Sequence, residues 1–240
     1  MHYSCCMSQA TVVVFLLLLI TAPLRASELT DAIAGLESAW AQVYYQNDEA
    51  QQQQKLPELL KKAEALAERY PQAAEPKIWQ ATIMITNAGV QSSINALSTL
   101  SMAKNLLEQA IQLNPLALDG SAYLTLGVLY YKVPPWPVSF GDNLMAENML
   151  KTSLKINPNG LDANYFYGDF LLEQDRASEA AEHFRRALQT SVRPNQSLAD
   201  MELHNAARQS LAECDKKQRS RGYRFMSLFD ANDYSGSPAN

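Results

Sequence analysis

The sequence predicts an all-α fold, a solenoid built by stacking helix pairs side by side. Apolar residues recur at helical spacing from Glu28 onward, and no stretch alternates polar and apolar residues for long enough to make a strand. Two residue patterns also recur in a fixed order, and the second of them ends at a proline. Of the 240 residues 47% are hydrophobic, which is enough for a continuous core and excludes a wholly disordered protein.

Residues 1–26 are predicted to be a signal peptide. Thr11–Ala22 is an uncharged apolar run that would span about 18 Å as a helix, well short of the roughly 30 Å hydrocarbon core of a bilayer. Cleavage is expected after Ala26, which would place the protein in the periplasm or outside the cell. An uncleaved anchor is the alternative, because no Lys or Arg precedes the run. Cleavage would leave Cys214 as the sole cysteine, so no internal disulfide is expected.

Two amphipathic helices are predicted in residues 28–74, as a degenerate first unit. Thr30 or Asp31 is expected to cap the first of them. The second is expected to begin at Pro57, because proline is tolerated in the first turn of a helix. The polar run Asp48–Lys55 between them, with four consecutive glutamines, is predicted to be a loop.

The recurring patterns define three further units, over residues 75–118, 119–160 and 161–194. The first helix of a unit carries an aromatic residue followed by Leu-Gly and Tyr, as in Tyr123–Tyr130. The second helix carries Ala-x3-Leu-x2-Ala-x4-Pro, in which small residues let helices approach closely and proline ends the pair. This second pattern occurs at Ala103–Pro115, at Ala146–Pro158 with Ser153 at the second Ala position and, in a longer form with Phe184 at the Leu position, at Ala180–Pro194.

The two patterns in this order resemble the tetratricopeptide repeat (TPR), over about Pro76–Pro194. The resemblance implies a TPR-like α-solenoid over residues 27–220, in which the first helix of each pair lines a concave face. It also implies a non-enzymatic scaffold that binds a protein or peptide partner on that face. A single helix over residues 196–220 is predicted to close the stack, and residues 221–240 are predicted to be a flexible tail.

Two insertions lengthen the units. In the first, Ser92 or Ser93 is expected to start an elongated second helix. The second is the proline-rich loop, residues 133–142, in which three prolines in four positions forbid a helix and Asp142 is placed to cap the next one. Two interpretations remain for this loop: Trp136 and Phe140 fold back as a lid over the stack, or together with Tyr131 they line a pocket for a ligand or partner.

The proline-rich loop and the stretch Ile156–Gln174 also resemble the T-component, the repeat protein of tripartite ATP-independent periplasmic (TRAP) transporters. That resemblance implies a periplasmic helical protein that associates with a solute-binding partner. It implies as well a small apolar ligand, held under the proline-rich loop. A TRAP accessory protein is therefore the alternative to the TPR scaffold.

The concave face is predicted from the positions that follow the aromatic residue opening each first helix. Aromatic anchors mixed with charges are the composition expected of a recognition surface, whereas the alternative is that these are ordinary half-buried positions of a solenoid. The candidate binding residues are Met84, Asn87, Val128, Tyr131, Lys132, Tyr165, Asp169 and Glu173, together with Trp136 and Phe140 of the loop.

No catalytic pattern accompanies the repeats, so no enzyme, metal site or cofactor is expected. His183 and His204 are the histidines left after residue 26, and neither stands at a metal-ligand spacing from Cys, Asp or Glu. The net charge of −5 disfavours nucleic acid as a partner. The basic run Lys216–Arg224 is expected to complement the negative end of the last helix, with contact to anionic lipid as the alternative.

Overall fold

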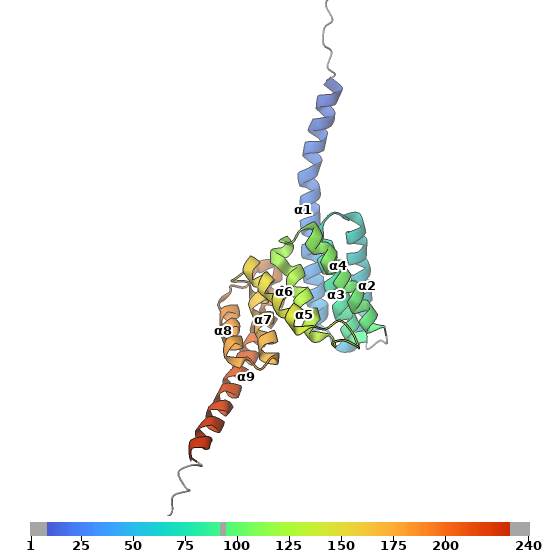
Figure 1. Cartoon of the computed structure of the whole chain (residues 1–240). Coiled ribbons are helices and arrows are strands. Elements are labelled where there is room, and N and C mark those ends of the chain that lie inside the picture. Colours follow the sequence, from blue (N-terminus) through green and yellow to red (C-terminus); the bar gives the residue numbers. More distant parts are fainter. Residues whose placement is uncertain (1–8, 92–94, 231–240) are drawn as a thin grey trace, which may run out of the picture.

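A computed structural model describes residues 9–91 and 95–230, with side chains for 27–91 and 95–219, and within these it contains nine α-helices (Figure 1). Side chains of the predicted leader, 1–26, and the predicted tail, 221–240, therefore lie outside the described residues. The helices are α1 (Gln9–Gln46), α2 (Glu49–Arg69), α3 (Ala74–Gln91), α4 (Ala96–Leu113), α5 (Ser121–Lys132), α6 (Asn143–Ile156), α7 (Leu161–Glu173), α8 (Ala177–Gln189) and α9 (Ser197–Asp230). Short 3-10 turns, η1 (Ala117–Gly120) and η2 (Pro194–Gln196), precede α5 and α9.

The helices form four consecutive pairs, α1–α2 to α7–α8, followed by α9 alone (Figure 1). Each helix packs against the next one in the sequence, and the first helices of neighbouring pairs also touch. No pair can bury its apolar face by itself, so the pairs stack in a row. The predicted all-α solenoid is confirmed.

The repeat patterns mark the places where two helices come closest. A Cβ added to Gly127 on α5 would lie 2.7 Å from Cγ of Leu150 on α6, and one added to Gly168 on α7 would lie 2.9 Å from the ring of Phe184 on α8. Leu150 and Phe184 are fully buried, as is Leu107 at the same position of α4. Glycine is thus required where a large side chain of the second helix rests against the backbone of the first.

The first pair departs from its predicted boundaries. Asp48 caps α2 by accepting a hydrogen bond from the Gln51 backbone N–H at 2.9 Å, so the predicted loop over 48–55 is wrong. Glutamine is a good helix former, and Pro57 consequently lies inside α2 rather than in its first turn. The cap predicted at Thr30 or Asp31 is also wrong, because α1 runs through both positions without a break.

The two insertions have different structures. α4 begins at Ala96 after Asn95, and not at Ser92 or Ser93, which lie outside the described residues. Asp142 caps α6 as predicted, since its carboxylate accepts hydrogen bonds from the backbone N–H groups of Leu144 at 2.8 Å and Met145 at 3.0 Å. The last predicted boundary is displaced, because the backbone of α9 remains helical to Asp230, beyond residue 220.

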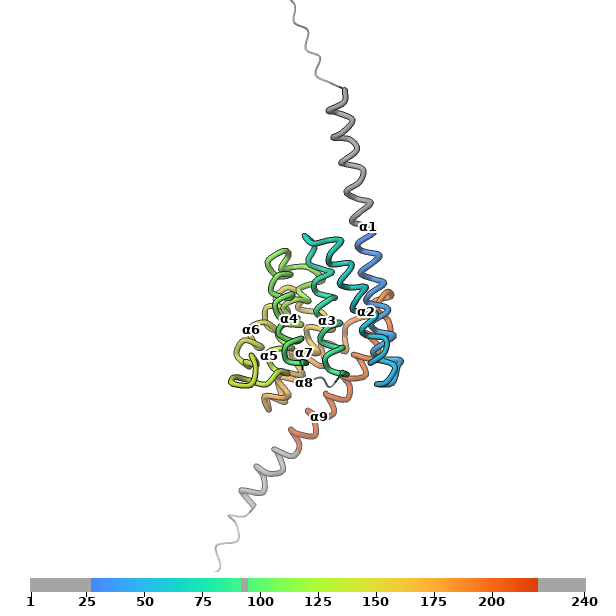
Figure 2. Tube along the Cα trace, turned by 90° about the vertical axis from the view of Figure 1, so that its right-hand side faces the viewer, coloured from blue at the N-terminus to red at the C-terminus, as the bar shows by residue number. Residues whose placement is uncertain are grey.

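The row of first helices closes on itself. Besides its neighbours α2 and α3, α1 contacts α9 and η2 at the other end of the chain (Figure 2). Gln196 in η2 donates a hydrogen bond to the carboxylate of Glu37 on α1. The concave face is therefore not an open groove. The contact of α1 with η2 and α9 bounds the side that a solenoid would leave open.

Glu147 on α6 connects this helix to α7 and to Arg176, the residue that precedes α8. Oε1 accepts hydrogen bonds from Arg176 Nη1 at 2.8 Å and from Tyr167 Oη at 3.0 Å, and it lies 2.8 Å from Lys151 Nζ. Hydrogen bonds from Arg176 and then Lys151 lower the pKa of Glu147 from 4.5 to about 2. The charged form is thus stabilised in the folded protein.

Glu147→Gln is expected to lower the free energy of unfolding by about 2–3 kcal/mol at pH 7. Because the folded pKa lies below the unfolded value, the contribution is complete above about pH 4.5 and is lost as the pH falls toward 2. Urea unfolding between pH 7 and pH 2.5 measures it, with Glu58→Gln on the exposed surface of α2 as the control. A difference between Glu147→Gln and wild type that does not shrink over this range would contradict the assignment.

Candidate functional site

The concave face holds a cavity of about 390 Å³. Residues from α1, α3, α5, α7 and the start of α9 all line it, so every unit contributes its first helix. One wall is apolar and aromatic, with Trp40, Ile78, Trp79, Ile85, Leu124, Val128 and Phe166 among its residues. The polar part of the lining includes Glu37, Thr82, Thr86, Asp119, Asp162, Arg193 and Gln196.

Two tryptophans from α1 and α3 form the aromatic wall. The rings of Trp40 and Trp79 lie 5.8 Å apart between centroids with an interplanar angle of 60°. Trp40 Nε1–H donates a hydrogen bond to Thr86 Oγ1 at 3.0 Å, which fixes the orientation of its ring. Trp79 is only 8% exposed, and its buried Nε1–H has no hydrogen-bond partner among the described residues.

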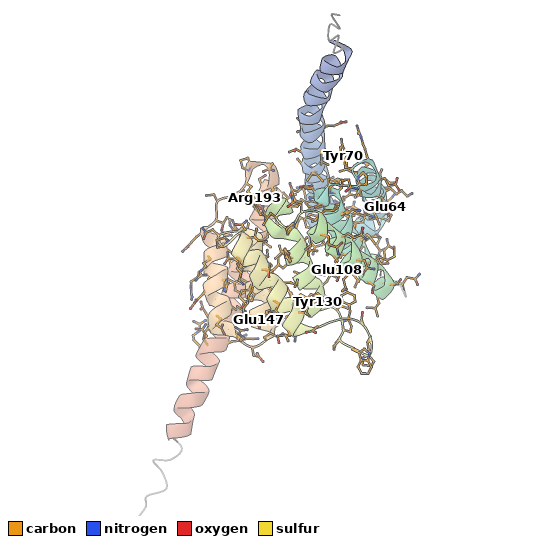
Figure 3. All side chains as sticks on the ribbon, turned by 45° about the horizontal axis from the view of Figure 1, so that its top comes forward. Glu64, Tyr70, Glu108, Tyr130, Glu147 and Arg193 are labelled. Atoms are coloured by element: carbon orange, nitrogen blue, oxygen red, sulfur yellow. The ribbon has the colours of Figure 1, made fainter. Side chains whose placement is uncertain are left out.

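Arg193, between α8 and η2, organises the charged end of the cavity. Its Nη2 lies 2.9 Å from Oδ2 of Asp162 on α7, and its Nε lies 3.1 Å from Oδ2 of Asp200 on α9. The Arg193 backbone N–H also donates to Asp200 at 2.7 Å, and Asp200 is only 1% exposed. Figure 3 shows Arg193 at the opposite end of the α7–α8 pair from Glu147.

Burial dominates the electrostatics at this end. It raises the pKa of Asp162 and of Glu37, although Arg193 opposes the shift at both carboxyl groups. Burial also disfavours the charged form of Arg193, but its hydrogen bonds to Asp200 and the charge of Asp162 outweigh this and raise the pKa of Arg193. The guanidinium of Arg193 thus stays charged. Its charge only partly offsets the effect of burial on the carboxyl groups of Glu37 and Asp162.

The backbone of η1 is strained beside the cavity. Leu118 and Asp119, which both line it, have φ angles of 47° and 55°, in the left-handed region that non-glycine residues rarely adopt. Each such residue costs about 1–2 kcal/mol. Gly120 follows with φ of 80°, so the turn into α5 ends on a residue that tolerates this conformation.

A second cluster lies at the C-terminal ends of α5 and α7, and it joins four of the predicted binding residues. Tyr131 Oη donates to Asp169 Oδ2 at 2.8 Å, and Lys132 Nζ lies 2.9 Å from the same oxygen and also pairs with Glu173. Burial, followed by the charge of Asp169, raises the pKa of Tyr131. The structure therefore brings four of the predicted binding residues together in a tyrosine–lysine–carboxylate cluster, whose members bond to one another.

The comparisons with known proteins bear on the fold. No protein-family model matches the chain, and no curated protein matches it. A solved structure that does match is a thermophilic TPR protein of Thermus thermophilus, with 16% sequence identity and a TM-score of 0.52. The match covers 80% of this chain and 95% of that one. The chain has the tetratricopeptide-repeat fold.

Within this TPR solenoid, the predicted concave residues are divided. Val128 lines the cavity, whereas Met84 is 5% exposed and packs in the core. Tyr165 is half-buried against Phe184, with ring centroids 5.8 Å apart. Asn87 is half-buried near the end of α3 and contributes nothing to the cavity lining.

The error on α3 has a physical cause. The repeat pattern makes Trp79 the aromatic residue that opens the unit, which puts positions 80, 84 and 87 on the concave face. In the TPR solenoid Trp79 itself lines the cavity, together with Thr82 and Ile85 on the same face of α3. The face of α3 that lines the cavity is thus offset from the predicted face by one to two residue positions. On α5, where Leu-Gly fixes the register, Val128 lines the cavity as predicted.

The proline-rich loop does not cover the cavity. Trp136 is 85% exposed, and none of the residues from 133 to 142 lines the cavity. Phe140 packs edge-on against Tyr130, with ring centroids 5.9 Å apart, and Nζ of Lys104 on α4 lies 5.9 Å from the centroid of the Phe140 ring. The lid interpretation therefore holds for Phe140 and is wrong for Trp136.

Sequence reasoning missed the residues that give the cavity its chemistry. No repeat pattern singles out Trp40, Phe166 or Arg193, and none points to Glu37. The available signal was an aromatic residue on the predicted inner face of each first helix. Because the first unit is degenerate, no pattern showed which face of α1 points inward.

The metal-ligating side chains of the described residues do not gather in one place. The described residues contain no group of three or more His, Cys, Asp or Glu side chains that could hold a metal ion. Cys214 is buried on α9, and burial raises the pKa of its thiol, which makes the thiolate less available as a nucleophile. In the part of the chain that the structure describes, no helix is both long and apolar enough to cross a membrane.

Proposed function

We propose that the protein is an exported, non-enzymatic TPR scaffold that binds a protein or peptide partner on its concave face. One observation carries the proposal: the first helices of all units and α9 surround a cavity that combines aromatic and charged side chains. Aromatic residues and arginine are the side chains enriched at energetically important positions of interfaces. TPR folds commonly mediate protein–protein interaction, which supports the same class of function.

The dimensions favour a short segment of the partner. A volume of about 390 Å³ lies in the range of ligand pockets and suits a few side chains rather than a folded domain. The Tyr131–Lys132–Asp169–Glu173 cluster offers polar groups on the same two helices, α5 and α7, beyond the cavity. A bound segment could then contact the cavity through its side chains and the cluster through its backbone.

Val128→Arg is expected to reduce partner capture at least tenfold, because a charged side chain would fill the cavity from α5. The measurement is a pull-down from the native cell envelope, with captured proteins quantified by mass spectrometry against wild type. Val192→Arg, at an exposed valine outside the cavity lining, is the matched control. Partner capture that survives Val128→Arg in a protein with unchanged thermal stability would contradict binding on the concave face.

A second candidate function, a TRAP-transporter accessory that holds a small apolar ligand, is favoured by the cavity itself. Its apolar wall suits such a ligand, and its position is the concave face rather than the space under the proline-rich loop. Native mass spectrometry of the purified protein distinguishes the two candidates. A co-purified small molecule lost in Val128→Arg favours the accessory protein, and an empty cavity with a captured polypeptide favours the scaffold.

Export is a separate part of the proposal. It rests on the apolar run Thr11–Ala22 and on the small residue Ala26 that follows it. N-terminal sequencing of protein isolated from the envelope fraction tests it. A first residue of Ser27 is expected, whereas a full-length chain in the cytoplasm would overturn it.

A further inference from the structure

The lining of the concave cavity carries more negative than positive charge. Glu37, Asp119 and Asp162 line it, and Arg193 is the one cation among its described lining residues. Arg193 is already shared between Asp162 and the fully buried Asp200. The guanidinium therefore neutralises Asp200 first and leaves a surplus of carboxylates facing the cavity.

Of the two lining carboxylates whose pKa burial raises, Glu37 is the one without an ion pair in the described part of the chain. It accepts a hydrogen bond from the Gln196 side chain and, among the described residues, forms no ion pair. Burial raises the pKa of both Glu37 and Asp162, so their ionised forms are penalised. A cation placed between them would offset that penalty, because opposite charges attract and the two carboxylates are only partly in contact with water.

Three aromatic side chains, Trp40, Trp79 and Phe166, line the same space. Ring faces attract cations, and tryptophan does so most strongly. The cation–ring contacts within the described part of the chain all lie elsewhere, at Tyr70, Phe140 and Tyr131. The aromatic wall is therefore available to a cation from outside the chain.

Trp79 adds its ring to this apolar wall. It is only 8% exposed, and its Nε1 is inaccessible and has no partner among the described residues, so the ring and not the N–H is what a ligand in the cavity would meet. An ammonium group and an apolar stem occur together in a lysine side chain.

We propose that the concave cavity recognises a basic side chain, above all lysine, within an otherwise apolar peptide segment. The ammonium group lies between Glu37 and Asp162, and its alkyl stem packs on Trp40 and Phe166. This inference rests on the proposed function, since it names the chemistry of the partner that the concave face binds. The neighbouring cluster is also acidic, because it holds two carboxylates, Asp169 and Glu173, and one cation, Lys132.

Three pools of acetylated, amidated pentapeptides test the proposal. The central residue is fixed as lysine, norleucine or glutamate, and the flanking positions are randomised among apolar residues. Norleucine matches the stem of lysine without its charge. Each pool is incubated with the full-length chain, and bound peptides are quantified by affinity-selection mass spectrometry at low and at physiological salt.

The lysine pool is expected to be retained at least tenfold more than the norleucine pool, the glutamate pool not at all, and the preference should fall as salt rises. Glu37→Gln should reduce the preference for lysine at least fivefold, while Glu68→Gln, an exposed glutamate on α2, should leave it unchanged. Equal retention of lysine and norleucine, or a preference untouched by Glu37→Gln, would overturn the lysine assignment while leaving peptide binding intact. Retention of no pool would overturn the proposed function as well.

Discussion

Replacing Arg193 by methionine is expected to lower the free energy of unfolding by about 3 kcal/mol. Asp200 is only 1% exposed, and the guanidinium of Arg193 supplies its charge partner. Without the guanidinium, the Asp200 carboxylate would remain buried. From residue 193 it would keep only the hydrogen bond donated by the backbone N–H. The loss comes mainly from leaving this charge unpaired, since a partly exposed ion pair adds little by itself.

Urea unfolding followed by circular dichroism measures the effect of Arg193→Met. The double variant Arg193→Met with Asp200→Asn serves as the control, because it removes the stranded charge. It is expected to recover at least half of the lost stability. A loss below about 1 kcal/mol in the single variant, or no recovery in the double variant, would show that this pair does not hold α9 against α7.

Phe184→Ala is expected to destabilise the protein by about 3–5 kcal/mol. The ring of Phe184 is fully buried on α8 and lies against Gly168 of α7, where no side chain can move in to fill the space. Its removal would leave a cavity between the two helices of the last pair, and the cost of such a cavity adds to the lost burial of the ring.

Chemical unfolding of Phe184→Ala beside Phe184→Leu measures that cost. Leucine keeps much of the volume and is expected to lose less than half as much stability. Gly168→Ala provides the complementary test, because its Cβ would lie 2.9 Å from the same ring and force it to move. Phe184→Ala at wild-type stability would mean that the repeat pattern does not mark the contact between paired helices.

The stacking of helix pairs could be predicted because its causes are local. Ala103, Leu107 and Ala110 lie on one face of one helix, and the same spacing returns in the next two units. Such positions pack only against a neighbour in the sequence, so a repeat reveals both the contact and its order. Two of the helix boundaries that failed, at Asp48 and Thr30, lie in the first pair, where this repetition is weak.

The cavity could be predicted only in part, because its position depends on the curvature of the whole stack. Glu37 and Gln196 meet across 159 positions of the chain, and no short pattern encodes that contact. The register of α5 was right since Gly127 must face Leu150, whereas α3 has Thr82 and Ile83 in place of Leu-Gly and its face was misplaced. Electrostatic partners such as Arg193 and Asp162 are likewise brought together by the stack and not by their spacing.

Closure of the first helices around the cavity is tested most directly by cross-linking α1 to α9. Ser38 and Ser197 both line a small cavity of about 220 Å³ at the seam between these helices. With the native cysteines changed to serine, Ser38→Cys paired with Ser197→Cys should be joined by a short bismaleimide within the monomer, whereas Ser38→Cys paired with Ser101→Cys on α4 should not. Failure of the first pair to cross-link in folded protein would show that the stack is open and that α1 and α9 do not bound the cavity together.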